Sequence, residues 1–140
     1  IDASCDIKIS LQYNKIIKNP KNTFNLHTGL LPKYGGVNIL SHTIKNKEKE
    51  QGLTFHKMGD KLDYGPIISR ISYPVLSEDS VEDLYKRQLL LAPDFLLSCL
   101  ELLKNINEKQ IDNCLKEKPI LYKREEFKWE DGKKELQNLK

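Results

Sequence analysis

The chain has 140 residues, with 23 Lys and Arg against 20 Asp and Glu, so its formal net charge is +3. Apolar residues make up 39% and charged residues 31%, a balance typical of one globular domain rather than a fibre or a disordered tail. No apolar run approaches the roughly 18 residues of a membrane span, and the small charge is spread over both signs, so we expect neither membrane nor nucleic-acid binding. The three cysteines suit neither a disulfide framework nor a metal site, which predicts reduced thiols and a cytoplasmic protein.

The first elements are short. Residues 7–11 alternate apolar and polar side chains, which predicts a strand, and a second strand is predicted over residues 23–27. Residues 37–46 predict a short helix because their apolar positions recur at spacings of three and four. The charged residues 45–50 then read as a solvated turn.

Two longer strands follow, over residues 52–58 and 67–75, and the turn-rich stretch between them favours an antiparallel pair. Strict alternation would put Ile67, Ser69, Ile71, Tyr73 and Val75 on one face of the second strand.

A long helix is predicted from Ser80, with Asp83 three residues later in a variant of the capping box and a kink at Pro93. Its predicted core stripe is Val81, Leu84, Tyr85, Leu89, Ala92, Phe95, Leu96, Cys99, Leu100 and Leu103.

Polar side chains suited to chemistry gather between residues 25 and 66. Asn25 and His27 leave the same face of one strand, and Thr54 and His56 repeat that geometry on another. Together with Asp63, an amide, an imidazole and a carboxylate suit proton transfer during attack on a carbonyl. A hydrogen-bonded core histidine is an open alternative. A zinc site built from the three histidines and the aspartate lacks a tight two-ligand spacing, so no metal is expected.

Two sequence blocks resemble those of the folate-dependent formyltransferases. Residues 25–36 read Asn-Leu-His-Thr-Gly-Leu-Leu-Pro-Lys-Tyr-Gly-Gly, similar to that family's Asn-x-His-x-x-Leu-Leu-Pro-x-Tyr-x-Gly signature. Residues 52–56, followed by 62–68, are similar to its Gly-x-Thr-x-His…Asp-x-Gly-x-Ile block. The two motif histidines precede the motif aspartate by 36 and 7 positions, as in the family. The resemblance covers roughly residues 3–104.

The resemblance implies transfer of a formyl group from 10-formyltetrahydrofolate, as co-substrate, to an amine. Asn25, His27 and Asp63 match the catalytic trio, while Thr54 and His56 match positions that line the site and hold the aspartate or its water. The remaining matched positions are expected to line the folate pocket: Gln12, Tyr13, Ile16, Lys57, Met58, Gly59, Asp60 and Leu62.

The implied fold is α/β, a Rossmann-like formyltransferase fold that lacks its N-terminal strand–helix units. We expect residues 1–104 to form a partial catalytic domain and residues 105–140 a polar C-terminal extension. Such a chain would pack abnormally, pair with another chain as in a homo-oligomer, or belong to a longer protein.

The expected acceptor is a small-molecule amine. The short stretch after the helix leaves no room for the β-barrel domain of tRNA-formylating members. The tail residues 121–127 faintly resemble those of sugar formyltransferases, which favours a nucleotide-linked amino sugar. Gly35, where such members often carry Arg, leaves the acceptor open. Alternatives are glycinamide ribonucleotide or another amine, a folate hydrolase that uses water, and a truncated non-catalytic remnant.

Overall fold

The computed structural model describes residues 7–11 and 22–123, and every structural statement below concerns those residues. Its centre is a four-stranded sheet in the order β1 (Lys8–Leu11), β2 (Thr23–His27), β4 (Glu50–Lys57), β5 (Ile67–Pro74). β1 runs parallel to β2, whereas β2–β4 and β4–β5 are antiparallel. The predicted α/β class and the predicted antiparallel pair are confirmed.

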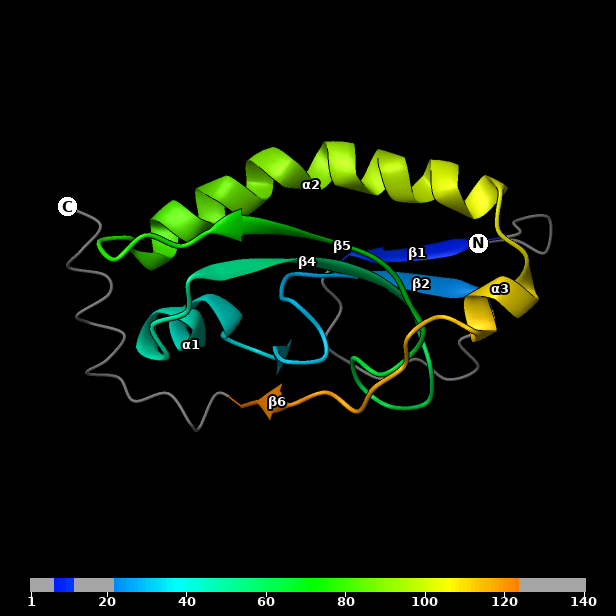
Figure 1. Cartoon of the computed structure of the whole chain (residues 1–140), viewed down its shortest axis with the longest axis horizontal. Coiled ribbons are helices and arrows are strands. Elements are labelled where there is room, and N and C mark those ends of the chain that lie inside the picture. Colours follow the sequence, from blue (N-terminus) through cyan, green and yellow to red (C-terminus); the bar gives the residue numbers. More distant parts are fainter. Residues whose placement is uncertain (1–6, 12–21, 124–140) are drawn as a thin grey trace.

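Helix α2 (Val81–Lys104) lies along one face of this sheet, and the short helix α1 (Ile39–Lys45) lies on the other side together with β6 (Leu121–Tyr122) (Figure 1). β6 pairs in parallel with β3 (Gly35–Gly36) to form a second, two-stranded sheet. Helix α3 (Glu108–Asp112) lies near one end of the main sheet.

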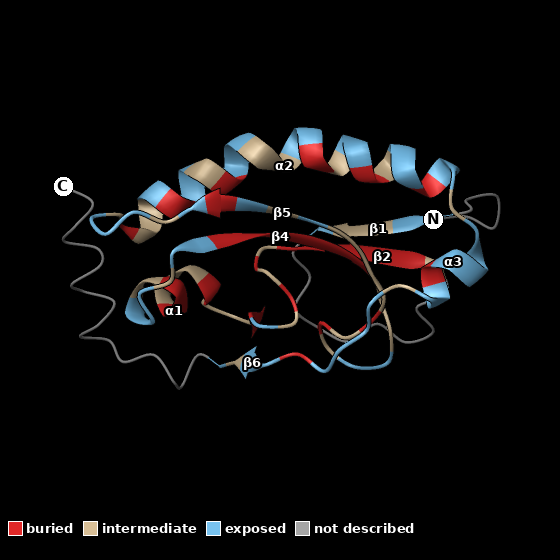
Figure 2. Cartoon of the chain, viewed as in Figure 1, coloured by how far each residue is buried: buried red, intermediate tan, exposed pale blue. Residues whose placement is uncertain are grey.

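The two faces of the sheet have different chemistry because successive side chains of a strand point in opposite directions. The face under α2 is apolar: Phe24 and Phe55 stack with ring centroids 5.5 Å apart, and Phe95 and Cys99 of the helix complete the buried cluster with their neighbours (Figure 2). The opposite face of the same strands carries the polar side chains described in the next subsection.

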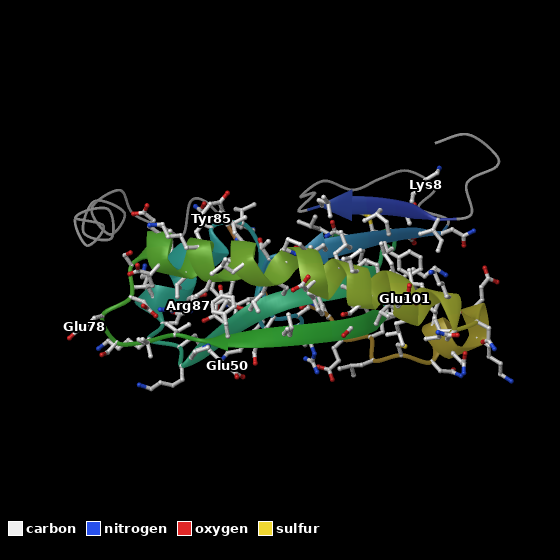
Figure 3. The ribbon with its side chains drawn as sticks, turned by 90° about the horizontal axis from the view of Figure 1, so that it is seen from above. Lys8, Glu50, Glu78, Tyr85, Arg87 and Glu101 are labelled. Carbon is white, nitrogen blue, oxygen red and sulfur yellow. The ribbon has the colours of Figure 1, made fainter. Side chains whose placement is uncertain are left out.

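The start of α2 confirms its predicted N-terminus. Ser80 accepts a hydrogen bond from the Asp83 backbone N–H, and the Asp83 side chain accepts one from the Ser80 N–H, which completes a capping box. Arg87 pairs through both guanidinium nitrogens with Asp79, and it also donates to the Pro74 carbonyl. Figure 3 shows Arg87 near the N-terminal end of α2, beside the loop that carries Glu78.

The predicted core stripe of α2 is wrong at two positions. Tyr85 and Leu89 are about half exposed, at 47% and 52%, whereas the polar Gln88 is buried. The helix buries Leu84 and Phe95 as predicted, but between them it buries Gln88 rather than Tyr85 and Leu89. α2 runs as one helix from Val81 to Lys104 with Pro93 inside it, and Figure 1 shows it as a continuous, arched ribbon.

Two predicted boundaries also shift. The helix predicted over 37–46 begins at Ile39, because Val37 donates its N–H to the Tyr122 carbonyl (3.0 Å) and so extends the β3–β6 pairing. β4 begins at Glu50, inside the predicted turn, because Glu50 and Gln51 already pair with β5.

A β-bulge breaks the predicted alternation of β5. His56 pairs with Ile67 and Phe55 pairs with Ser69, so Ile68 is an extra residue on that strand. Consequently Ile68, rather than Ile67, packs against the apolar cluster.

The described residues beyond 104 return toward the sheet. Ile111 of α3 is buried in the apolar cluster, and the Leu115 carbonyl accepts a hydrogen bond from the first residue of β5 (2.8 Å). The boundary at residue 104 stays a prediction. Across the part of the chain that the structure describes, no helix is both long and apolar enough to cross a membrane.

Candidate active site

The face of the sheet away from α2 brings together the strand residues of both sequence blocks. Asn25 lies opposite His56, and His27 lies opposite Thr54, in the β2–β4 register. All four side chains are at most 5% exposed. The predicted same-face arrangement of each pair is therefore present, and the antiparallel pairing joins the two pairs into one cluster.

His27 lies between a backbone carbonyl and a carboxylate. Its Nε2 is 2.7 Å from the Tyr34 carbonyl oxygen, and because a carbonyl can only accept, Nε2 carries a proton. Its Nδ1 is 3.5 Å from Asp63 Oδ1. The two acceptors therefore suit a ring that carries protons on both nitrogens and a positive charge.

Asp63 is buried in the loop between β4 and β5, hereafter the second site loop (residues 58–66). Its backbone has φ 51°, in the left-handed region that Asp and Asn tolerate better than most residues. Its Oδ2 accepts the Gly36 backbone N–H at 2.8 Å while Oδ1 faces His27. The Asp63 carboxylate thus connects the loop that follows β4 with Gly36, in the loop that follows β2.

Asn25 and His56 form the other half of the cluster. His56 Nδ1 lies 3.0 Å from the Lys57 carbonyl, so Nδ1 carries the proton and Nε2 is free to accept. Asn25 Nδ2 lies 3.4 Å from His56 Nε2 and donates to it. This contact orients the Asn25 side-chain amide. Burial lowers the pKa of His56, which favours the neutral ring that this contact requires.

The lowered pKa of His56 predicts a pH-dependent stability. The folded protein keeps the His56 ring neutral, while in the unfolded chain the ring takes up a proton once the pH falls below its ordinary pKa of 6.5. The unfolded state therefore binds more protons, and stability should fall as pH decreases from about 7.5 to about 5.5. Thermal unfolding at both pH values should show a smaller decrease for His56→Gln, which keeps hydrogen-bonding groups but cannot titrate. Equal decreases in the two proteins would contradict this role of His56.

Thr54 organises the loop that follows β2, hereafter the first site loop (residues 28–38). Its hydroxyl donates to the Gly29 carbonyl at 2.7 Å and accepts the Leu31 N–H at 3.0 Å. Gln51, also on β4 and fully buried, accepts the Leu30 N–H at 2.7 Å. Two buried polar side chains of one strand therefore fix the start of the loop.

Gly29 permits the close approach of this loop to the histidine. A Cβ at this position would lie 2.6 Å from the Tyr34 carbonyl oxygen and 2.9 Å from His27 Nε2. Those distances are too short for real contacts, so a side chain here would displace the hydrogen bond between Tyr34 and His27.

The other predicted site residues lie in or before the second site loop. Lys57 ends β4, and its N–H donates to the Pro66 carbonyl, while the Met58 N–H donates to the Thr23 carbonyl. Gly59 and Leu62 are partly buried and Asp60 is exposed in the same loop. Gln12, Tyr13 and Ile16 lie outside the described residues.

Two contacts of the cluster come from backbone groups that side-chain patterns do not identify, namely the Tyr34 carbonyl and the Gly36 N–H. The available signal was the Tyr-Gly-Gly end of the first sequence block. Among residues 7–11 and 22–123, no group of three or more His, Cys, Asp or Glu side chains could hold a metal ion.

The formyl transferase family model matches residues 9–100, which is more than half of the chain. The chain belongs to this family. The predicted family relationship is thereby confirmed, and both sequence blocks lie inside the matched range.

Similar proteins include several kinds of formyltransferase. The chain is 42% identical over 88 residues to the bifunctional polymyxin resistance protein of Wigglesworthia glossinidia brevipalpis, covering 59% of the chain and 14% of that protein. It is 33% identical over 112 residues to the methionyl-tRNA formyltransferase of Kosmotoga olearia, covering 76% of the chain and 35% of that protein.

One similar solved structure is the N-formyltransferase of Helicobacter canadensis in complex with folinic acid and dTDP-3-aminofucose. The identity is 27% and the TM-score 0.70, over 86% of this chain and 46% of that one. The formyltransferase fold expected from the sequence is thus confirmed. The chain spans about half of this formyltransferase and about a third or less of the two curated relatives.

Proposed function

We propose that this chain carries the catalytic residues of a formyltransferase that moves a formyl group from 10-formyltetrahydrofolate to an amine. The observation that supports this most is the buried cluster of Asn25, His27 and Asp63, with His27 between the Tyr34 carbonyl and the carboxylate. Membership of the formyl transferase family gives the same reaction class.

The cluster suits a carbonyl whose oxygen gains negative charge. As the acceptor nitrogen bonds to the formyl carbon, that charge develops on the formyl oxygen. The Asn25 amide donates toward this oxygen, and the charged His27 ring stabilises it in a buried site where such contacts are strong. The formyl group of 10-formyltetrahydrofolate, a substrate of the reaction, is therefore a group that these side chains can activate.

Asp63 serves the proton balance. The new carbon–nitrogen bond forms, the bond between the formyl carbon and N10 of the folate breaks, and the proton lost by the amine finally resides on N10. The buried carboxylate beside His27 can accept the amine proton, directly or through water. The second site loop, with Lys57, Met58, Gly59, Asp60 and Leu62, is proposed to face the pterin.

We propose a nucleotide-linked amino sugar as the acceptor. Support comes from the Helicobacter canadensis relative, whose structure contains dTDP-3-aminofucose. The methionyl-tRNA formyltransferase of Kosmotoga olearia is 33% identical to this chain over 112 residues. Methionyl-tRNA must therefore be tested directly as a competing acceptor.

The test combines donor binding with an acceptor screen on the full-length protein. Calorimetric titration with a non-hydrolysable analogue of 10-formyltetrahydrofolate should show saturable binding. With the natural donor, a dTDP- or UDP-linked amino sugar should be converted to the formamide with release of tetrahydrofolate, detected by mass spectrometry. Glycinamide ribonucleotide and methionyl-tRNA serve as competing acceptors.

Each alternative gives its own result. Formylation of glycinamide ribonucleotide alone would refute the sugar acceptor but retain the reaction class. Formate release without an added amine would indicate a hydrolase. A folded protein that does not bind the analogue would support a non-catalytic remnant.

A further inference from the structure

The chain after α3 crosses both loops of the site. This return segment (residues 115–122) lies outside the range matched by the family model, which ends at residue 100. Figure 1 shows it passing beneath the sheet from α3 to β6. At one end, the Leu115 carbonyl accepts the Ile67 N–H, and Lys116 Nζ lies 5.1 Å from the centre of the ring of Tyr64, which belongs to the second site loop.

At its other end, the return segment pairs with the first site loop through backbone hydrogen bonds. Ile120 donates its N–H to the Pro32 carbonyl (2.9 Å) and accepts the Gly35 N–H (2.8 Å), and the Tyr122 carbonyl accepts the Val37 N–H (3.0 Å). The fit is so close that a Cβ on Gly36, whose φ is 93°, would lie 2.1 Å from the Tyr122 carbonyl oxygen.

This pairing determines which way the loop's peptide groups point. The C=O and N–H of a trans peptide point in opposite directions. The Gly35 N–H is directed at Ile120, so the Tyr34 carbonyl of the same peptide faces away from β6, where it accepts the His27 Nε2 proton.

The same alternation applies to Asp63. Because the N–H groups of Gly35 and Val37 are directed at the return segment, the Gly36 N–H between them points to the opposite side. There it donates to Asp63 Oδ2. A shift of the pairing by one residue would exchange these directions and remove both contacts with the cluster.

An aromatic stack adds a side-chain contribution. The Tyr122 ring stacks on Tyr34 with centroids 5.0 Å apart and an interplanar angle of 11°, and it also contacts His42. The Tyr122 hydroxyl accepts a hydrogen bond from Asn46. The ring therefore packs on the residue whose carbonyl holds His27.

We propose that the return segment is a positioning element of the active site: its pairing with the first site loop directs the Tyr34 carbonyl to His27 and the Gly36 N–H to Asp63. The catalytic importance of those two contacts rests on the proposed function. The dependence of their geometry on the return segment does not. Ile120 and Tyr122 are thus positioning residues.

The test uses two matched pairs of variants in the full-length protein. Ile120→Pro removes the N–H that bonds Pro32, while Ile120→Ala keeps it and truncates a side chain that is mostly exposed. Tyr122→Ala removes the stack on Tyr34, while Tyr122→Phe keeps it and loses only the hydroxyl. The readouts are the His27 ring N–H resonance in protein labelled with ¹⁵N-histidine, and steady-state kinetics.

For Ile120→Pro and Tyr122→Ala we expect the His27 Nε2 proton to exchange with solvent at least about tenfold faster than in the wild type. In the same two variants kcat should fall by about 10- to 100-fold, with KM for the folate donor within about twofold. Ile120→Ala and Tyr122→Phe should resemble the wild type in both readouts. An unchanged His27 resonance in all four variants would overturn the proposal.

Loss of dispersed amide resonances in both Ile120→Pro and Tyr122→Ala would also overturn it, because the segment would then support the whole fold rather than the site. If the wild type transfers no formyl group but the His27 resonance responds as expected, the proposed function fails and the positioning inference stands.

Discussion

Replacing Asp63 with Asn should reduce formyl transfer by about 10³-fold while the protein keeps its fold and its affinity for the folate donor. Asn has nearly the same shape, tolerates the left-handed backbone of this position (φ 51°), and its Oδ1 can still accept the Gly36 N–H. What it loses is the negative charge beside His27 and the capacity to accept a proton. Single-turnover rates with saturating donor and acceptor measure the effect on the chemical step.

The matched control is Asp94→Asn, which removes the same charge from an exposed position on α2. Its transfer rate should equal that of the wild type. Calorimetric titration of the Asp63→Asn protein with the non-hydrolysable analogue separates lost binding from lost chemistry. Retention of most of the transfer activity by Asp63→Asn would remove this carboxylate from the mechanism.

The side chains of the site could be predicted because strand geometry is local. Two positions separated by two residues share a face of any strand, so Asn25 with His27, and Thr54 with His56, follow from the sequence once the strands are recognised. Asp63 could be named as a candidate from its turn-rich loop, but its contact with His27 could not be derived from the strands, because a loop carboxylate has no periodic signal.

Backbone contacts at the site could not be predicted in the same way. The Tyr34 carbonyl and the Gly36 N–H contact the cluster only because a distant two-residue strand, β6, pairs with the first site loop. A two-residue strand has no measurable alternation, and its partner lies more than 80 positions away. A sequence pattern therefore gives no indication of this pairing.

The fold shows the same division between local and distant causes. The capping box at Ser80 was predictable because its two partners are three residues apart. The bulge at Ile68 was not, because it depends on how β5 aligns with β4 across the sheet. Burial of Gln88 in place of Leu89 likewise depends on how α2 lies against the sheet.

The largest effect on stability is expected from Phe55→Ala, because Phe55 supports the sheet directly beneath the site. Its side chain is 0% exposed and stacks on Phe24, while its chain neighbours Thr54 and His56 point to the opposite, polar face. Removing a buried aromatic ring should decrease the free energy of unfolding by about 3–5 kcal/mol. Thermal unfolding should show a decrease in Tm of about 10 °C.

Leu90→Ala provides the control, since it removes an apolar side chain that is 80% exposed on α2 and should change stability by less than about 0.5 kcal/mol. Below its transition, the Phe55→Ala protein should keep the His27 and His56 ring resonances, because their hydrogen bonds lie on the other face of the sheet. A loss of stability below about 1 kcal/mol would mean that the apolar face is not the main support of the fold. Early loss of the ring resonances would instead show that packing under α2 and the geometry of the site are directly coupled.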